Sequence, residues 1–135
     1  MIRLQAVLIL LLTAITNLFA ADLSYPPSYL DMGLPEYENA VVTGLGRDNT
    51  SLRDGITITL FTEDNGATLR TYYETEMQDR GWVLQETVAS KKMRAAGMLD
   101  KLPFGAIFSK DGMRFQLFTN PEGNGLAVHI SINEE

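Results

Sequence analysis

His129 is the single histidine of this 135-residue chain, so every histidine-dependent acid–base or metal site would have to be built around it. Histidine is the side chain used most often for proton transfer, and it is a common metal ligand. Within Leu126–Ile132, strand alternation places Leu126 and Val128 on one face and His129 on the other. We therefore expect a solvent-facing histidine on a sheet. A hydrolase that combines His129 with carboxylates from elsewhere in the chain is the catalytic alternative.

Motifs for other chemistries are absent from the sequence. The chain has no cysteine, which excludes thiol nucleophiles, thiolate metal sites and disulfides. It contains no G-x-S-x-G elbow and no G-x-x-x-x-G-K-[ST] loop. Asp48, Asn49 and Asp54 could approach a cation, but their spacing is not that of a calcium loop, so a solvated turn is expected. We predict neither a metal nor a cofactor.

The stretch Thr68–Trp82 (TLRTYYETEMQDRGW) is dense in tyrosine, acid and arginine. Glu74 and Glu76 are two residues apart, which on a helix is about 200°, so they cannot converge on one substrate atom. Four apolar residues fall at intervals of three and four and would face a sheet: Leu69, Tyr72, Tyr73 and Met77. Gly81 is placed to end the helix and turn Trp82 back onto Met77. The stretch therefore predicts a structural helix over about 65–80.

Ser90–Leu102 (SKKMRAAGMLDKL) is basic within a chain of net charge −6, because it holds four basic residues and one acidic residue. A short helix over about 91–102 would align Ala95, Met98, Leu99 and Leu102. Two interpretations stay open. The segment packs over the free face or edge of its own sheet, or it is a docking surface for an acidic partner or anionic lipid. The partner-binding residues of the second interpretation are Lys91, Lys92, Met93, Arg94, Met98, Leu99 and Lys101. Nucleic acid is not expected as a partner of so acidic a chain.

The N-terminus has the pattern of an export signal. Arg3 precedes the apolar run Ala6–Ile15, which is short for a membrane span, and the expected cleavage follows Ala20. We therefore predict a signal peptide at 1–20, an extended Pro/Tyr leader at 21–39, a single domain at 40–135, and a periplasmic or secreted location. An uncleaved segment would instead tether the protein to the inner membrane.

Strand signals occupy most of the remaining chain. Ile56–Phe61 and Leu126–Ile132 alternate clearly, and Asp111-Gly112 is a strong hairpin signal. The sequence predicts an α+β fold with about six mostly antiparallel strands and the long helix on one face. The predicted strands are Ala40–Leu45, Ile56–Phe61, Trp82–Val88, Ala106–Lys110, Met113–Thr119 and Leu126–Ile132.

The order of these features resembles small exported bacterial domains of uncharacterised function. Those domains have a strand, a T-x-D turn, a helix with F-Y-x-x-x-L, then G-W and further strands. Here Tyr72-Tyr73, Met77 and Gly81-Trp82 occupy those positions, and the likeness covers about Leu34–Val88. The basic segment departs from that pattern. The resemblance implies the fold and no activity, so we expect a non-enzymatic binding or accessory domain.

Overall fold

The computed structural model describes residues 23–46, 55–99 and 104–135. The predicted signal peptide at 1–20, the loop positions Asp48, Asn49 and Asp54, and Lys101 lie outside these ranges. None of the described helices has the length and apolar character needed to span a membrane.

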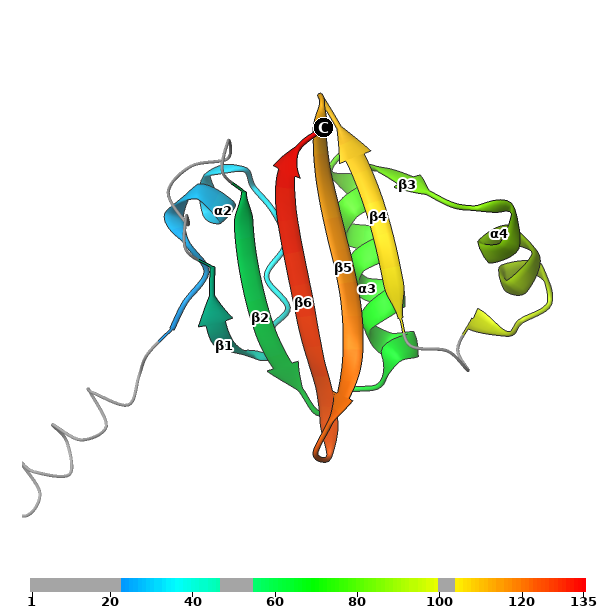
Figure 1. Ribbon diagram of the computed structural model, residues 1–135, viewed down its shortest axis with the longest axis horizontal. Coiled ribbons are helices and arrows are strands. Elements are labelled where there is room, and N and C mark those ends of the chain that lie inside the picture. Colours follow the sequence, from blue (N-terminus) through cyan, green and yellow to red (C-terminus); the bar gives the residue numbers. More distant parts are fainter. Residues whose placement is uncertain (1–22, 47–54, 100–103) are drawn as a thin grey trace, which may run out of the picture.

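The described strands form one six-stranded antiparallel sheet in the order β1-β2-β6-β5-β4-β3 (Figure 1). This confirms the predicted α+β class. The first and last strands in this order are edge strands, and the longest strands, β5 and β6, pair in its middle. The bounds are β1 Val41–Leu45, β2 Ile56–Thr62, β3 Val83–Gln85, β4 Gly105–Lys110, β5 Met113–Glu122 and β6 Gly125–Glu134.

Strand alternation separates the sheet into a core face and a free face. Ile58, Ile130 and Leu117 are aligned across β2, β6 and β5, and all three are buried. On the other side Thr59, His129 and Phe118 are aligned in the same way, so the predicted orientation of His129 is confirmed. The open face is defined here as the face opposite the core, with these main side chains: Val41, Thr57, Thr59, Phe61, Val83, Gln85, Ile107, Ser109, Arg114, Gln116, Phe118, Asn120, Ala127, His129, Ser131 and Asn133.

Helix α3 (Gly66–Asp79) confirms the prediction from Thr68–Trp82. The Asn65 side chain accepts a hydrogen bond from the Thr68 amide at 2.9 Å and caps its first turn. Gly81 has a φ of 85°, and the Trp82 amide donates to the Met77 carbonyl at 3.0 Å. This geometry needs a residue that tolerates positive φ, which explains the glycine, and it folds Trp82 into the core.

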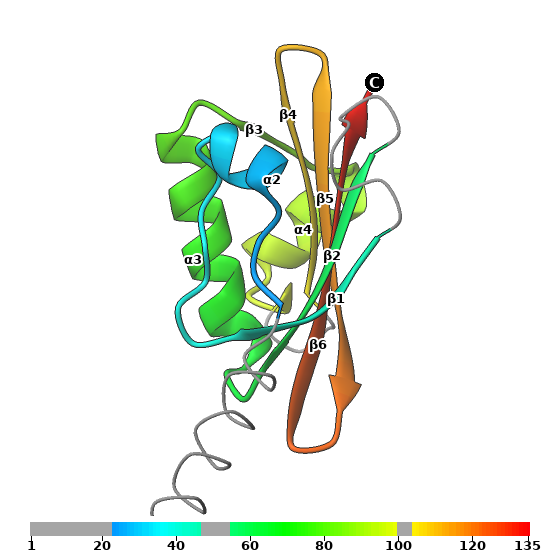
Figure 2. The same cartoon turned by 90° about the vertical axis from the view of Figure 1, so that its left-hand side faces the viewer.

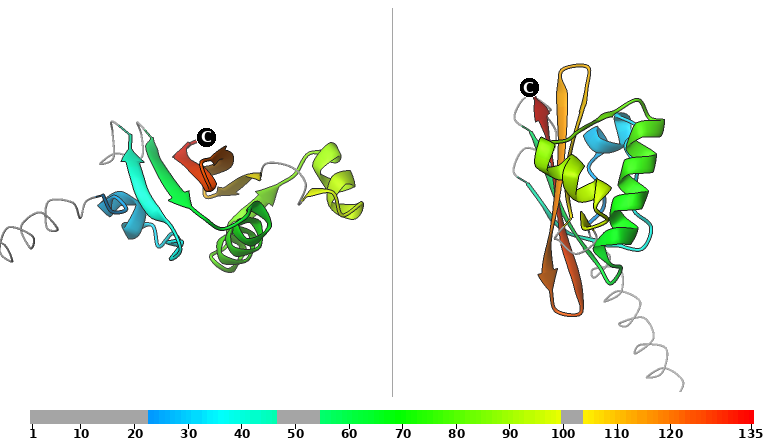
Figure 3. Two further views of the ribbon diagram at one scale, coloured as in Figure 1. Left: turned by 90° about the horizontal axis from the view of Figure 1, so that it is seen from below. Right: turned by 90° about the vertical axis from the view of Figure 1, so that its right-hand side faces the viewer.

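Residues 23–40 lie over the core face beside α3, as Figures 2 and 3 show. The predicted leader contains a short helix, α2 (Pro27–Asp31), which begins at a proline whose φ suits a first turn. Tyr25, Tyr29 and Tyr37 are buried there. Together with Tyr72 and Tyr73 of α3 they bring all five tyrosines of the chain into one layer.

Two predicted boundaries are wrong. The strand expected over Trp82–Val88 is reduced to β3, because Thr87 caps a new helix by accepting a hydrogen bond from the Ser90 amide at 3.0 Å. That helix, α4, spans Val88–Ala95 instead of 91–102. It ends early because Gly97, at a φ of 69°, reverses the chain and the Met98 amide donates to the Met93 carbonyl.

Candidate functional site

Helix α4 extends beyond the β3 edge of the sheet and covers neither of its faces (Figures 1 and 3). It buries none of its residues. An eight-residue helix is marginal in water on its own, so something other than core packing must hold it in place.

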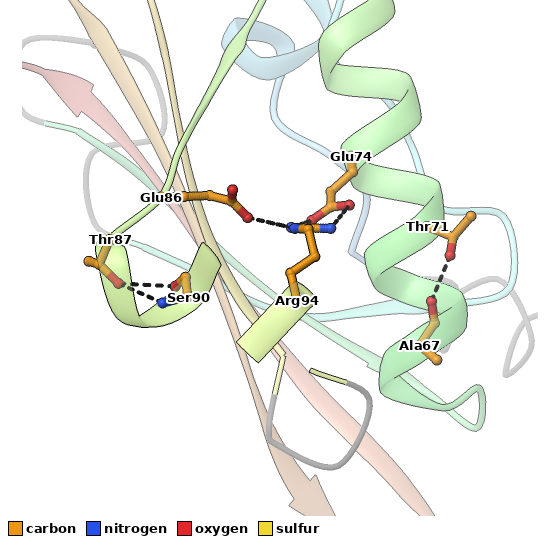
Figure 4. Close-up of polar contacts among 7 residues, drawn as sticks. All are labelled: Ala67, Thr71, Glu74, Glu86, Thr87, Ser90 and Arg94. Atoms are coloured by element: carbon orange, nitrogen blue, oxygen red, sulfur yellow. Dashed lines mark hydrogen bonds and ion pairs between the residues drawn. The ribbon is translucent and has the colours of Figure 1, made fainter. Parts of the chain in front are cut away.

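Arg94 supplies this attachment. Its guanidinium makes two hydrogen bonds to the Glu74 carboxylate, at 2.5 and 3.1 Å, and one to Glu86 at 2.7 Å (Figure 4). The two glutamate side chains are 18% and 17% exposed, so their charges are partly shielded from water. The hydrogen bond to Glu74 is the main cause that raises the pKa of Arg94. Arg94 therefore joins α4 to α3 and to the residue after β3, and its charge is used within the domain.

The remaining cations of α4, Lys91 and Lys92, are both exposed. Lys92 lies nearly opposite Arg94, about 200° around the helix, whereas Lys91 lies about 60° from Arg94. With Val88, which is 72% exposed, and Ala95 the two lysines form a continuous stripe at positions i, i+3, i+4 and i+7. We call these four residues the outward stripe. It consists of two ammonium groups beside a small apolar surface.

The other predicted partner-binding residues are divided between two environments. Met93 and Leu99 are half-buried, and Met98 is exposed after the helix end. Leu99 and Arg94 line a hollow of about 230 Å³ between α3 and α4. The predicted alignment of Ala95, Met98 and Leu99 on one helix does not form, because the helix stops at Ala95.

Val88 is the residue that sequence reasoning missed. The sequence pattern places it at the end of a strand, although the preceding Thr87 is a residue type favoured at a helix N-cap. Once Thr87 is taken as the N-cap, Val88 becomes the first residue of α4 and falls on the same side as Lys91 and Lys92.

His129 lies on the open face and its ring stacks on Phe118, with ring centroids 4.7 Å apart. Among the described residues no carboxylate is hydrogen-bonded or ion-paired to it. The described residues also contain no group of three potential metal ligands. The geometry gives the hydrolase alternative no support.

A second polar site joins the residues before β1 to the start of α3. Asp64 accepts hydrogen bonds from the Tyr37 hydroxyl and, at 2.9 Å, from Asn39. These bonds lower the pKa of Asp64, the one from Tyr37 most. Tyr37 and Asn39 also line a hollow of about 420 Å³ with Glu36, Tyr72 and others. Because the Asp64 bonds connect two segments of one domain, we assign this cluster a structural role.

Comparison with known proteins finds no matching family model, curated protein or solved structure. The fold and the candidate site therefore define a structural class of protein. It is a small α+β domain with an exposed basic helix attached at one edge of its sheet. The resemblance to exported bacterial domains stays a prediction.

Proposed function

We propose that this protein is an exported, non-enzymatic binding domain that docks on an acidic protein surface through the outward stripe of α4. One observation supports this most strongly: α4 buries none of its own residues, yet Arg94 fixes it in a defined orientation. A short helix held in this way, with its outward stripe exposed, is available to a partner. Export rests on the N-terminal pattern of the sequence.

Charge determines the kind of partner. Lys91 and Lys92 present two positive charges on a chain of net charge −6, so they attract a negative surface that the rest of the protein repels. A helix that lies in a membrane interface needs a broad apolar face with large side chains. Only Val88 and Ala95 accompany the lysines in the outward stripe. An acidic protein surface therefore fits better than anionic lipid.

A photo-crosslinking residue placed at Val88 tests this proposal in the producing cell, with the same residue at Thr75, exposed on α3, as the reference position. We expect a product specific to Val88 whose crosslinked peptide, identified by mass spectrometry, is rich in aspartate and glutamate. Identical products from both positions, or no product at Val88, would contradict the proposal.

Affinity for the purified partner supplies the quantitative test. Replacing Lys91 and Lys92 by glutamine should weaken binding at least about tenfold, since both charges meet carboxylates. The matched control is Thr75→Glu with Gln78→Glu, which lowers the net charge by the same amount at exposed positions of α3. Equal loss of binding in both variants would show only a general charge effect. Binding to vesicles containing phosphatidylglycerol, without binding to the protein, would favour lipid and reject the proposal.

A further inference from the structure

The open face of the sheet is not covered by any described segment. Helices α3 and α2 and the other described residues of 23–40 lie on the core face (Figures 2 and 3). The open face nevertheless carries four of the large apolar side chains that are exposed: Val41, Val83, Ile107 and Phe118. At its centre the stacked rings of Phe118 and His129 form a flat aromatic surface.

The open face is also almost without charge. Between the row that contains Phe61 and the row that contains Arg114, its described side chains include no carboxylate. Glu122 shares the same orientation, but it lies at the tip of the β5–β6 hairpin, beyond the ends of β2 and β4. Arg114 is 3.9 Å from the Glu135 carboxylate, which also accepts a hydrogen bond from Ser109. The charge of this edge row is therefore balanced locally.

We propose that the open face is a self-association surface, on which a second copy of this chain packs sheet against sheet. Two molecules of net charge −6 repel each other over most approaches, because carboxylates such as Glu36, Glu38 and Asp79 are exposed on the other sides of the domain. On the open face the copies meet without opposing like charges. A strongly charged partner, by contrast, finds no complementary charge there.

The dimensions of the face suit such a contact. Six strands about 4.8 Å apart, over about seven residues of about 3.3 Å each, give a planar footprint of roughly 600 Å². Accessible area exceeds planar area on a corrugated surface, so this approaches the roughly 800 Å² per partner of a standard interface. Two sheets that pack face to face are about 10 Å apart, which lets Phe118 and Ile107 of each copy bury against the other. We expect a weak, concentration-dependent dimer.

Sedimentation equilibrium over a wide concentration range tests this inference on the protein as recovered from the producing cell. Phe118 is 51% exposed, so Phe118→Glu and Phe118→Lys should preserve the fold, which circular dichroism checks. Both should raise the dimer dissociation constant at least about tenfold, since each places an unpaired charge in the contact. Leu30→Glu is the matched control, because Leu30 is 46% exposed and lies on α2 away from this face. It should leave the dimer intact.

Spin labels locate the contact directly, because the chain has no cysteine of its own. Labels at Gln116→Cys, near the centre of the open face, should lie much closer together than labels at Thr75→Cys on α3. A protein that is monomeric at every concentration overturns the inference. So does a dimer that survives both Phe118 variants, or one in which the Thr75 labels are the closer pair.

The variant with glutamine at Lys91 and Lys92 separates this inference from the proposed function. It should dimerise as the unmodified protein does, whatever its effect on partner binding, because α4 does not cover the open face. If these two substitutions remove the dimer, α4 forms the contact and the open-face assignment is wrong.

Discussion

Tyr29 and Tyr73 are both fully buried, but their hydroxyl groups have different surroundings. The Tyr29 hydroxyl donates to the Pro35 carbonyl at 2.5 Å. The Tyr73 hydroxyl has no partner with hydrogen-bond geometry among the described residues, although the Tyr25 hydroxyl is near enough to influence its pKa. A buried hydroxyl without a hydrogen bond costs free energy, whereas a satisfied one contributes to stability.

We predict opposite effects when each hydroxyl is removed. Tyr73→Phe should leave the free energy of unfolding unchanged within about 0.5 kcal/mol or increase it, since an unsatisfied group is lost. Tyr29→Phe should lower it by about 1–2 kcal/mol, because the buried Pro35 carbonyl loses its donor. Urea unfolding followed by tryptophan fluorescence measures both. A larger loss for Tyr73→Phe than for Tyr29→Phe would contradict this assignment.

Helices α3 and α4 are held in place by different kinds of contact. Helix α3 is fixed by Leu69, Tyr73 and Met77, all buried against the sheet. Helix α4 depends on its caps and on the ion-pair cluster of Arg94, Glu74 and Glu86. Its stability should therefore be local, and it should open without unfolding the domain.

Arg94→Gln tests this difference between the two helices. Amide hydrogen exchange in Val88–Ala95 should accelerate several-fold, because exposed ion pairs contribute about 0.2–1 kcal/mol each. The melting temperature should hardly change, since no buried side chain is disturbed. Arg114→Gln removes a charge from another exposed arginine and should leave α4 exchange unchanged. If Arg94→Gln lowered the melting temperature by many degrees, α4 would belong to the cooperative core.

The tyrosine layer makes the whole molecule sensitive to alkali. Burial raises the pKa of Tyr25 to about 12 and raises the pKa of Tyr29 and Tyr73 well above the ordinary value of 10.0. The unfolded chain therefore releases these protons at lower pH than the folded protein does. The stability associated with the neutral tyrosines is complete below pH 10 and is lost as the pH rises through the folded-state pKa values.

We expect stability to fall steadily from about pH 10 to about pH 12, where Tyr25 ionises in the folded state. Tyrosinate absorbance near 295 nm should appear in step with the loss of near-ultraviolet circular dichroism, because the buried rings ionise when the domain unfolds. If the tyrosines instead ionised near pH 10 while the fold stayed intact, their rings would be accessible to solvent and the prediction would be wrong.

Elements whose residues lie close together along the chain are predictable from local sequence patterns. Alternation in Ile56–Phe61 and Leu126–Ile132 is sufficient to orient β2, β6 and His129, and Gly81 marks the end of α3. These signals are local because they arise from strand and helix periods and from backbone torsions.

Contacts between residues far apart in the chain are seen only in the folded protein. Arg94 binds Glu74, twenty residues earlier, and this pairing changes Arg94 from a predicted partner contact into an attachment point for α4. The Pro/Tyr segment joins the core because Tyr37 packs against Tyr72 and Tyr73 of α3, and Tyr25 stacks on Tyr29 within the same buried cluster. Such contacts depend on the three-dimensional arrangement of α3, β3 and the chain before β1. No periodicity along the sequence encodes that arrangement, whereas burial and ion pairing select it during folding.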